Sequence, residues 1–314
     1  MTVQETAAWL KEHDRYLILT HRRPDGDTIG CGAGLCAALR ALGKTAWMLP
    51  NDGVTATFAC YAQPYWAPEG YAHEQVVSVD IASLGLLPAN AEPYKNCIAL
   101  AIDHHPSHEG FGARSCVDPD RAACGELVYD ICEALGVMNE EIALPLYVAV
   151  STDTGCFVYA NTTPDTHRVA AALMEQGDFA PQVNKRCFRT KSRRRLRLES
   201  AVISGMEFLD EGTTVIAAVP LELMARLEAT EGDAEELSAL GGQIEGVRVS
   251  VTLRELPGGK CKVSLRTDGS LNATQTCALL GGGGHAMASG ATVRGSLEEA
   301  KTAVLAAIRQ ARGC

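Results

Sequence analysis

Short apolar runs alternate with longer segments rich in small residues along the first half of the chain. The apolar runs predict four strands, at residues 16–20, 46–49, 75–79 and 97–102. The segments between and after them predict helices at 28–42, 125–135, 140–150 and 164–176. Because strands that alternate with helices form parallel sheets, we expect an α/β domain with a mainly parallel sheet that is flanked by helices and covered on both faces. Such sheets bind their ligands beyond the carboxyl ends of the strands.

The second half of the chain predicts a smaller α+β domain. Residues 213–219 have the pattern of a strand, and residues 221–229 and 234–240 have that of helices. Residues 247–253 and 260–265 flank a Leu-Pro-Gly-Gly turn and predict a hairpin. A predicted helix at 272–280 leads into four glycines, and a last helix covers 297–312.

The length of 314 residues is about twice that of a usual domain, which agrees with two domains. We predict a first domain over 1–184, a basic linker or helix over 185–200, and a second domain over 201–314, with a cleft between the domains. From Lys185 to Arg197 there are eight of the chain's 28 basic residues and no acid. This segment is either a solvated helix or linker, or a basic wall that meets a polyanionic substrate.

The charge balance restricts the partners of the protein. The 28 basic and 38 acidic residues give a formal charge of -10. This excludes a coat for long duplex nucleic acid, because such binding depends on Lys and Arg that replace counterions. It leaves room for a small anion at a site whose own charge is neutralised, for instance by metal ions.

The cysteines and the apolar runs indicate where the protein works. Twelve cysteines occur without any C-x-x-C spacing, so they predict neither a zinc knuckle nor a thioredoxin-like motif. The first residues contain acids and no long apolar stretch, unlike a signal peptide. No run of about 18 apolar residues is present that would span a bilayer. We therefore expect a reduced, cytoplasmic protein without a membrane partner.

Acids and imidazoles follow the apolar segments of the first half at four separate places. Each place by itself resembles an ordinary turn and helix cap. Four such places at the carboxyl edge of one parallel sheet instead predict a shared site. The residues concerned are His21, Asp25, Asp27, Asp80, Asp103, His104, His105 and Asp153.

The donors of this predicted site are carboxylate oxygens and imidazole nitrogens, with no thiolate. Such donors suit hard to borderline divalent ions; manganese fits best, and magnesium, cobalt and iron remain open. Two ions need a bridging carboxylate, and a central acid such as Asp80 can serve. Two adjacent ions suit hydrolysis at phosphorus. His105 either contacts the substrate or only orients its neighbour in the loop.

The glycine run predicts a second binding element. One glycine would end the preceding helix, whereas Gly281, Gly282, Gly283 and Gly284 together allow backbone amides to converge on an anion. His285 follows and can donate to the same phosphate, and Arg266 at the end of a predicted strand can reach a phosphate or a base. No Gly-Lys-Ser/Thr follows, so the segment is not a Walker P-loop.

Six motifs in this order resemble those of the DHH phosphoesterase family, in particular its NrnA-like branch of oligoribonucleases and pAp phosphatases. The motifs are HRRPDGDTIG at 21–30, VDIAS at 79–83, AIDHHPSH at 101–108, STDTGCF at 151–157, KVSLRT at 262–267 and GGGGHAMASG at 281–290. The resemblance covers essentially the whole chain. Residues 121–126 depart from the hydroxyl-rich stretch expected after the DHH motif, which affects substrate contacts rather than the metal site.

The resemblance implies a role for each residue of these motifs. His21, Asp25, Asp27, Asp80, His104 and Asp153 would hold two manganese ions, with Asp27 and Asp80 serving the second ion or bridging both. Asp103 would support the loop and His105 would lie near the scissile phosphate. Arg266, Gly282, Gly283, Gly284 and His285 would bind the substrate in a DHH-associated domain.

The activity implied by the resemblance is degradation of very short single-stranded RNA to 5′-mononucleotides and dephosphorylation of pAp to AMP, by a chain that we expect to form a homodimer. The alternative enzyme is a phosphodiesterase for linear or cyclic dinucleotides such as pApA, pGpG or cyclic di-AMP. A family II pyrophosphatase would lack the glycine-rich second domain, and a RecJ-type exonuclease is usually longer. A nucleotide sensor with a decayed centre is disfavoured because all six ligand positions carry competent residues.

Overall fold

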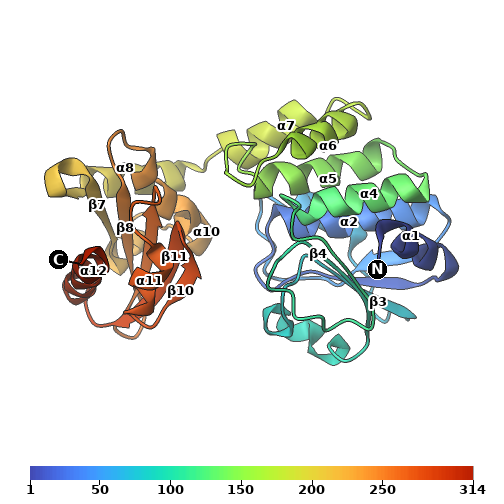
Figure 1. Ribbon diagram of the computed structural model, residues 1–314, viewed down its shortest axis with the longest axis horizontal. Helices are drawn as coiled ribbons and strands as arrows, with labels where there is room; N and C mark the ends of the chain where they lie inside the picture. Colours follow the sequence, from blue (N-terminus) through green and yellow to red (C-terminus); the bar gives the residue numbers. More distant parts are fainter. Residues whose placement is uncertain (314) are drawn as a thin grey trace. The chain divides into compact units, whose positions relative to one another are not determined.

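The chain forms two compact units, which divide after Thr190 within the basic segment. The structure, a computed structural model, describes residues 1–313 apart from the side chains of Glu235 and Glu236. The predicted α/β fold is confirmed: a parallel sheet flanked by helices is followed by a second sheet domain (Figure 1). In the described part of the chain, no helix has both the length and the apolar character needed to cross a membrane.

The first unit contains a five-stranded sheet in the order β2-β1-β3-β4-β5, in which every pair of neighbours is parallel. The chain runs from β1 outward to β2 and then returns to the other side of β1 with β3. This reversal is the switch point at which open α/β sheets bind ligands. The strands are β1 (Tyr16–Leu19), β2 (Ala46–Met48), β3 (Gln75–Val79), β4 (Ile98–Asp103) and β5 (Ser115–Val117).

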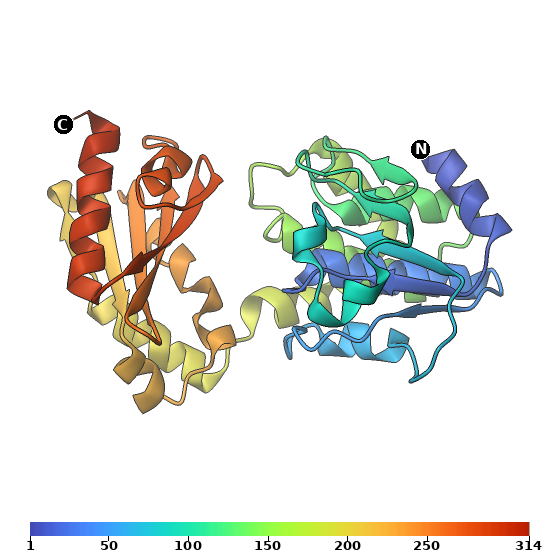
Figure 2. The same cartoon turned by 90° about the horizontal axis from the view of Figure 1, so that it is seen from below.

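Helices cover one face of this sheet, and an irregular segment covers the other. Tyr16 and Ile18 of β1 point into the helical core, whereas Leu17 and Leu19 pack against the connection after β3. Figure 2 looks at this second face and shows the connection in cyan and teal. The helices are α1 (Val3–Glu12), α2 (Gly26–Ala41), α3 (Ala59–Ala62), α4 (Cys124–Leu135), α5 (Glu140–Asp153), α6 (Pro164–Met174) and α7 (Ala180–Asn184), and a π-helical turn (Lys185–Arg189) follows.

Helices α2 and α5 approach each other closely because three glycines lie one turn apart on α2. A Cβ atom on Gly26 would lie 2.2 Å from the hydroxyl of Thr152, and one on Gly30 would lie 2.2 Å from the carbonyl oxygen of Pro145. A Cβ atom on Gly34 would lie 2.7 Å from the side chain of Leu146. No larger residue fits this face of α2, so its composition fixes the distance between the two helices.

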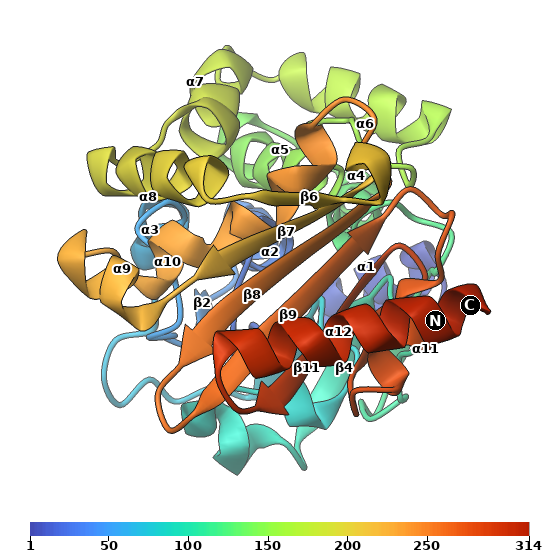
Figure 3. The same cartoon turned by 90° about the vertical axis from the view of Figure 1, so that its left-hand side faces the viewer.

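The second unit contains a six-stranded mixed sheet in the order β10-β11-β9-β8-β7-β6, in which β7 and β8 are parallel and the other pairs antiparallel. The predicted hairpin is confirmed as β8 and β9. Figure 3 shows α12 lying across one face of the sheet. The strands are β6 (Glu207–Leu209), β7 (Thr214–Val219), β8 (Val249–Leu256), β9 (Lys260–Thr267), β10 (Gly283–His285) and β11 (Ala288–Arg294).

Helices lie on both faces of this second sheet. Alternate residues of β7 point to opposite sides: Ile216 packs with α11 and α12, and Ala217 packs with α8, α9 and α10. The helices are α8 (Arg193–Ser204), α9 (Leu221–Arg226), α10 (Glu231–Ala234), α11 (Ala273–Ala278) and α12 (Leu297–Arg312).

Substituting Gly30 by Ala tests the close contact of α2 and α5. The added methyl group would meet a backbone carbonyl that cannot rotate away, so we expect Gly30→Ala to lower the free energy of unfolding by roughly 1–3 kcal/mol. Gly85→Ala is the matched control, since the nearest atom to a Cβ there is 3.8 Å away. Urea unfolding measures both variants. Equal stability of the two variants would contradict this account of the helix contact.

Candidate metal centre

The predicted ligands meet at the carboxyl edge of the first sheet. His21 follows β1, Asp80 follows β3 and His104 follows β4, so three neighbouring parallel strands deliver them to one edge. Asp80 has a left-handed backbone, with φ of 57°. Asp and Asn tolerate this conformation better than most residues, and it is frequent at functional sites.

The first group of donor atoms is formed by His21, Asp25 and Asp80. Asp25 caps the N-terminus of α2, where its carboxylate accepts from two backbone N–H groups. The Nε2 atom of His21 lies 3.5 Å from Oδ1 of Asp25 and 3.7 Å from Oδ2 of Asp80. Ligands that share one ion through bonds of about 2.1 Å lie about 3 to 3.5 Å apart, so this spacing is close to that of a coordination sphere.

The second group is formed by Asp27, His104 and Asp153. The Nε2 atom of His104 lies 3.7 Å from Oδ2 of Asp27 and 3.6 Å from Oδ2 of Asp153. It also lies 3.6 Å from Oδ1 of Asp80, whose other oxygen faces the first group. Asp80 therefore stands between the two groups, as a bridging carboxylate would.

Asp153 reaches the site from a helix and not from a strand. It is the last residue of α5, and the contact of α5 with α2 brings it opposite Asp27. The prediction that all the ligands follow the edge of the sheet is correct for His21, Asp80 and His104 but incomplete for this residue.

Backbone and side-chain groups hold two of the ligands in place. The Nδ1 atom of His104 donates to the carbonyl oxygen of Arg121 at 3.0 Å, which leaves the lone pair of Nε2 for a metal ion. Asp27 accepts from the backbone N–H groups of Cys124 and Gly125 at 2.7 and 2.9 Å. The segment that lacks the expected hydroxyls thus contributes through its backbone, which residue types alone did not reveal.

A thiol also contacts Asp27. The Sγ atom of Cys31, one turn further along α2, donates to Oδ1 of Asp27 at 3.2 Å. Burial raises the pKa of Cys31 well above that of an ordinary thiol. Sequence reasoning considered the cysteines for zinc and redox motifs and missed this contact.

The electrostatics of the site fit bound cations. Asp80 is 3% exposed, and its Oδ1 atom has no hydrogen-bond partner among the described residues. Burial and the charge of Asp27 raise the pKa of Asp80 well above its usual range, and burial and Asp27 also raise the pKa of Asp153 to about 7. Buried carboxylates without partners are costly, and a divalent ion supplies the missing positive charge. The donor set fits two such ions.

Asp103 organises the histidines beside the ligands. Its buried carboxylate accepts from Nδ1 of His105 at 2.8 Å and from Nδ1 of His108, also at 2.8 Å. The contact with Asp103 raises the pKa of His105. The His105 side chain stays 40% exposed, with Nδ1 3.6 Å from Oδ1 of Asp80. His108 was not predicted as a site residue, although it ends the DHHPSH motif.

Arg266 and His285 lie in one row across the second sheet. Arg266 of β9 is opposite Ala288 of β11, which is in turn opposite His285 of β10. Directly opposite residues point to the same face, so both side chains lie on one side of the sheet. The Arg266 guanidinium also reaches the hydroxyl of Ser238 at 3.5 Å.

The glycine run forms part of this sheet and is not a free loop. Gly281 ends the helical segment with φ of 73°. A Cβ on Gly282 would lie 2.1 Å from the carbonyl oxygen of Gly290, and Gly284 has φ of 144°. The backbone conformation or the packing therefore requires glycine at three of the four positions. At Gly283, in contrast, a side chain would meet open space. The exposed edge strand β10 leaves this backbone accessible.

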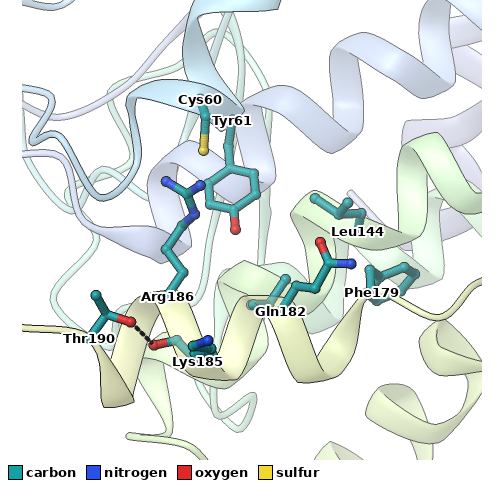
Figure 4. A pocket seen from close by; sticks show the side chains of 9 residues that line it. Cys60, Tyr61, Leu144, Phe179, Gln182, Lys185, Arg186 and Thr190 are labelled. Carbon is teal, nitrogen blue, oxygen red and sulfur yellow. Dashed lines mark hydrogen bonds between the residues drawn. The ribbon is translucent and has the colours of Figure 1, made fainter.

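The basic segment is divided between two roles. Lys185 and Arg186 line a pocket of about 500 Å³ in the first unit, shown in Figure 4. None of the predicted site residues lines it. The full lining comprises Cys60, Tyr61, Leu144, Phe179, Gln182, Val183, Lys185, Arg186 and Thr190.

The part of the segment in the second unit makes internal ion pairs. Lys191 and Arg195 contact the buried carboxylate of Glu199 at 2.8 and 2.9 Å, and Arg194 contacts Asp233 at 3.5 Å. These residues support the structural interpretation of the segment, whereas Lys185 and Arg186 are exposed and line the pocket of the first unit.

Known families match both units. The family described as the DHH family, N-terminal domain, matches residues 15–150, and the DHHA1 domain matches residues 212–312. Together with the relatives described next, these matches show that the chain belongs to the DHH phosphoesterase family.

Within that family, the chain is similar to proteins named bifunctional oligoribonuclease and PAP phosphatase NrnA. It is 36% identical to that of Thermus thermophilus over 93% of this chain and 89% of the relative. It is 24% identical to that of Bacillus subtilis over 90% of both. The crystal structure of an exopolyphosphatase-related protein from Bacteroides fragilis has a TM-score of 0.85 at 24% identity, covering 98% of this chain and 95% of that one.

Substituting Asp80 by Asn tests whether Asp80 repels the neighbouring carboxylates in the absence of metal and binds a metal ion when one is present. With a chelator present, Asp80→Asn removes one buried charge and should raise the melting temperature. With manganese present, the wild type should gain stability and the variant should gain much less. Asn suits the left-handed backbone at this position. The exposed Asp120→Asn is the control and should match the wild type in both conditions; a variant that gains as much from manganese as the wild type would exclude Asp80 as a ligand.

Proposed function

We propose that the protein is a dimanganese phosphohydrolase that degrades short oligoribonucleotides to 5′-mononucleotides and dephosphorylates pAp to AMP. The observation that carries the proposal is the pair of donor groups on either side of buried Asp80. The relatives named NrnA, which match nearly the whole chain, support this pair of substrates.

The ligands that we propose for the two ions are His21, Asp25, Asp27, Asp80, His104 and Asp153. Their oxygen and imidazole donors favour manganese over softer ions. When bound, such ions lower the pKa of a coordinated water and offset charge that develops on the phosphoryl group. The chain itself contributes prepositioned donors, because Arg121 and the start of α4 already orient His104 and Asp27.

His105 is proposed as the residue that contacts the scissile phosphate. Its Nδ1 proton is donated to Asp103, which leaves Nε2 as the ring nitrogen for a substrate contact on this partly exposed side chain. An imidazole whose pKa is raised can carry a proton on Nε2 and donate it to a phosphate or leaving-group oxygen. Asp103, fully buried between two histidines, fixes the orientation of His105.

The second unit is proposed to bind the substrate end away from the metal ions. Arg266 supplies a fork of donors, and His285 lies two strands away on the same face. Gly282, Gly283 and Gly284 leave the backbone of the edge strand accessible to an anion. By binding the end of the substrate, this site would select short substrates without reading their sequence.

We propose domains over 1–184 and 201–314 joined by the basic segment 185–200, so that the first carries the metal ions and the second recognises the substrate. The division of the structure after Thr190 falls within that segment. A homodimer and a cytoplasmic location stay predictions.

A substrate panel with manganese tests the proposed function. The purified protein should convert RNA of two to five nucleotides to mononucleotides and pAp to AMP. The dinucleotides pApA, pGpG and cyclic di-AMP, compared by kcat/KM, are the competing substrates. Inertness toward both short RNA and pAp would reject the proposal, and a clear preference for a dinucleotide would replace it.

His104→Ala should lower kcat/KM on this panel by more than about 100-fold, because it removes a ligand rather than a group that only supports one. His73→Ala is the matched control, since His73 packs against Tyr94 and lies outside the site. Circular dichroism verifies that both variants fold. A His104→Ala enzyme as active as the control would show that the second group of donors is not the catalytic one.

A further inference from the structure

The segment that follows Asp153 has an unusual backbone. Gly155, Cys156 and Phe157 are consecutive residues with φ of 56°, 58° and 67°. This left-handed conformation is rare for a bulky residue such as Phe157 and persists only where the surroundings enforce it. The chain therefore holds this turn in one defined shape directly beside a metal ligand.

Hydrogen bonds close this turn onto the end of α5. The backbone N–H groups of Val158 and Tyr159 donate to the carbonyl oxygen of Thr154 at 2.9 and 3.0 Å. The side chain of Asn161 donates to the carbonyl oxygens of Asp153 and Ala122 at 3.1 and 2.9 Å. Hydrogen bonds thus connect the turn to Asp153, a candidate metal ligand, and to Ala122 just before α4.

An aromatic ring anchors the turn from within. The Phe157 ring stacks on His167 of α6, with centroids 5.2 Å apart and an angle of 28° between the planes. It also lies 6.3 Å from the ring of Tyr147 on α5. With Phe157 committed to the interior, the next two residues are directed outward.

Those two residues form an exposed apolar tip. Val158 is 80% exposed, more than any other large hydrophobic side chain among the described residues, and Tyr159 is 59% exposed. The Tyr159 ring rests on Gly155: a Cβ there would lie 2.4 to 2.8 Å from three ring atoms. The ring is therefore seated two residues after Asp153 rather than free to swing.

We propose that Val158 and Tyr159 form a nucleobase-binding subsite, in which the Tyr159 ring stacks on the base next to the phosphate held at the metal centre. The inference rests on the proposed function, since it assumes a nucleotide substrate. An exposed aromatic ring on a fixed backbone offers stacking at little cost in conformational freedom. Because every base has a stacking face, the subsite accepts nucleotides without regard to sequence.

The test compares substrates with and without the base. Tyr159→Ala should lower kcat/KM for a dinucleotide, mainly through KM, by roughly tenfold, the range seen when a stacking ring is removed. A substrate with the same sugar–phosphate backbone but no base beside the scissile phosphate should react equally with wild type and variant. Tyr159→Phe keeps the ring and should restore the affinity. Met174→Ala, which truncates another exposed apolar side chain of the first unit, is the control.

A second measurement separates this inference from the proposed function. A dinucleotide that carries 2-aminopurine beside a non-hydrolysable linkage, added with manganese, should lose fluorescence on binding to wild type and Tyr159→Phe but not to Tyr159→Ala. Quenching by a wild type that hydrolyses no nucleotide would reject the proposed function and keep the subsite. Equal quenching by Tyr159→Ala, or an equal loss on the baseless substrate, would overturn the subsite.

Discussion

The contact between helices α2 and α5 is the constraint on which the metal centre depends. Ordinary helix pairs lie about 8–10 Å apart, as set by the side chains between them. Gly26, Gly30 and Gly34 leave no side chains on that face of α2, so α5 approaches until its own backbone and small residues fill the space. This close approach brings Asp153, at the C-terminus of α5, within reach of two other residues. They are Asp27 in the first turn of α2 and His104 directly after β4. The absence of side chains at these glycines thus determines how closely the donor atoms of the candidate centre lie to one another.

The carboxylates of the candidate centre repel one another, and hydrogen bonds within the first unit offset part of this repulsion. Two backbone N–H groups at the start of α4 face Asp27, and the carbonyl oxygen of Arg121 turns His104 so that its free nitrogen faces the acids. Asp80 receives no comparable support at Oδ1, and its pKa is raised the most clearly. The arrangement therefore favours bound cations, which agrees with a chain that is acidic overall.

Sequence reasoning located the candidate ligands that follow strands, because the carboxyl ends of parallel strands share one edge and their order along the chain is readable. It grouped Asp153 with the residues at the edge of the sheet, although the predicted helix over 140–150 ends just before it. It also missed Cys124 and Gly125, which contribute backbone N–H groups that no residue type announces. The glycine run was interpreted as a set of backbone amides that converge on an anion. The structure shows that Gly282 and Gly284 are also required by their close approach to β11. His108 and the tip at Val158 and Tyr159 depend on tertiary contacts, so hydropathy patterns carry no signal for them.

The thiol of Cys31 has a consequence for which ions the centre accepts. A cysteine next to a metal ligand ordinarily favours binding of zinc or cadmium, because both ions bind thiolate strongly. Here burial raises the pKa of the thiol, and the thiol donates its hydrogen to Asp27. The closed packing around α2 therefore favours a protonated thiol beside the candidate metal site over the thiolate to which thiophilic metals bind.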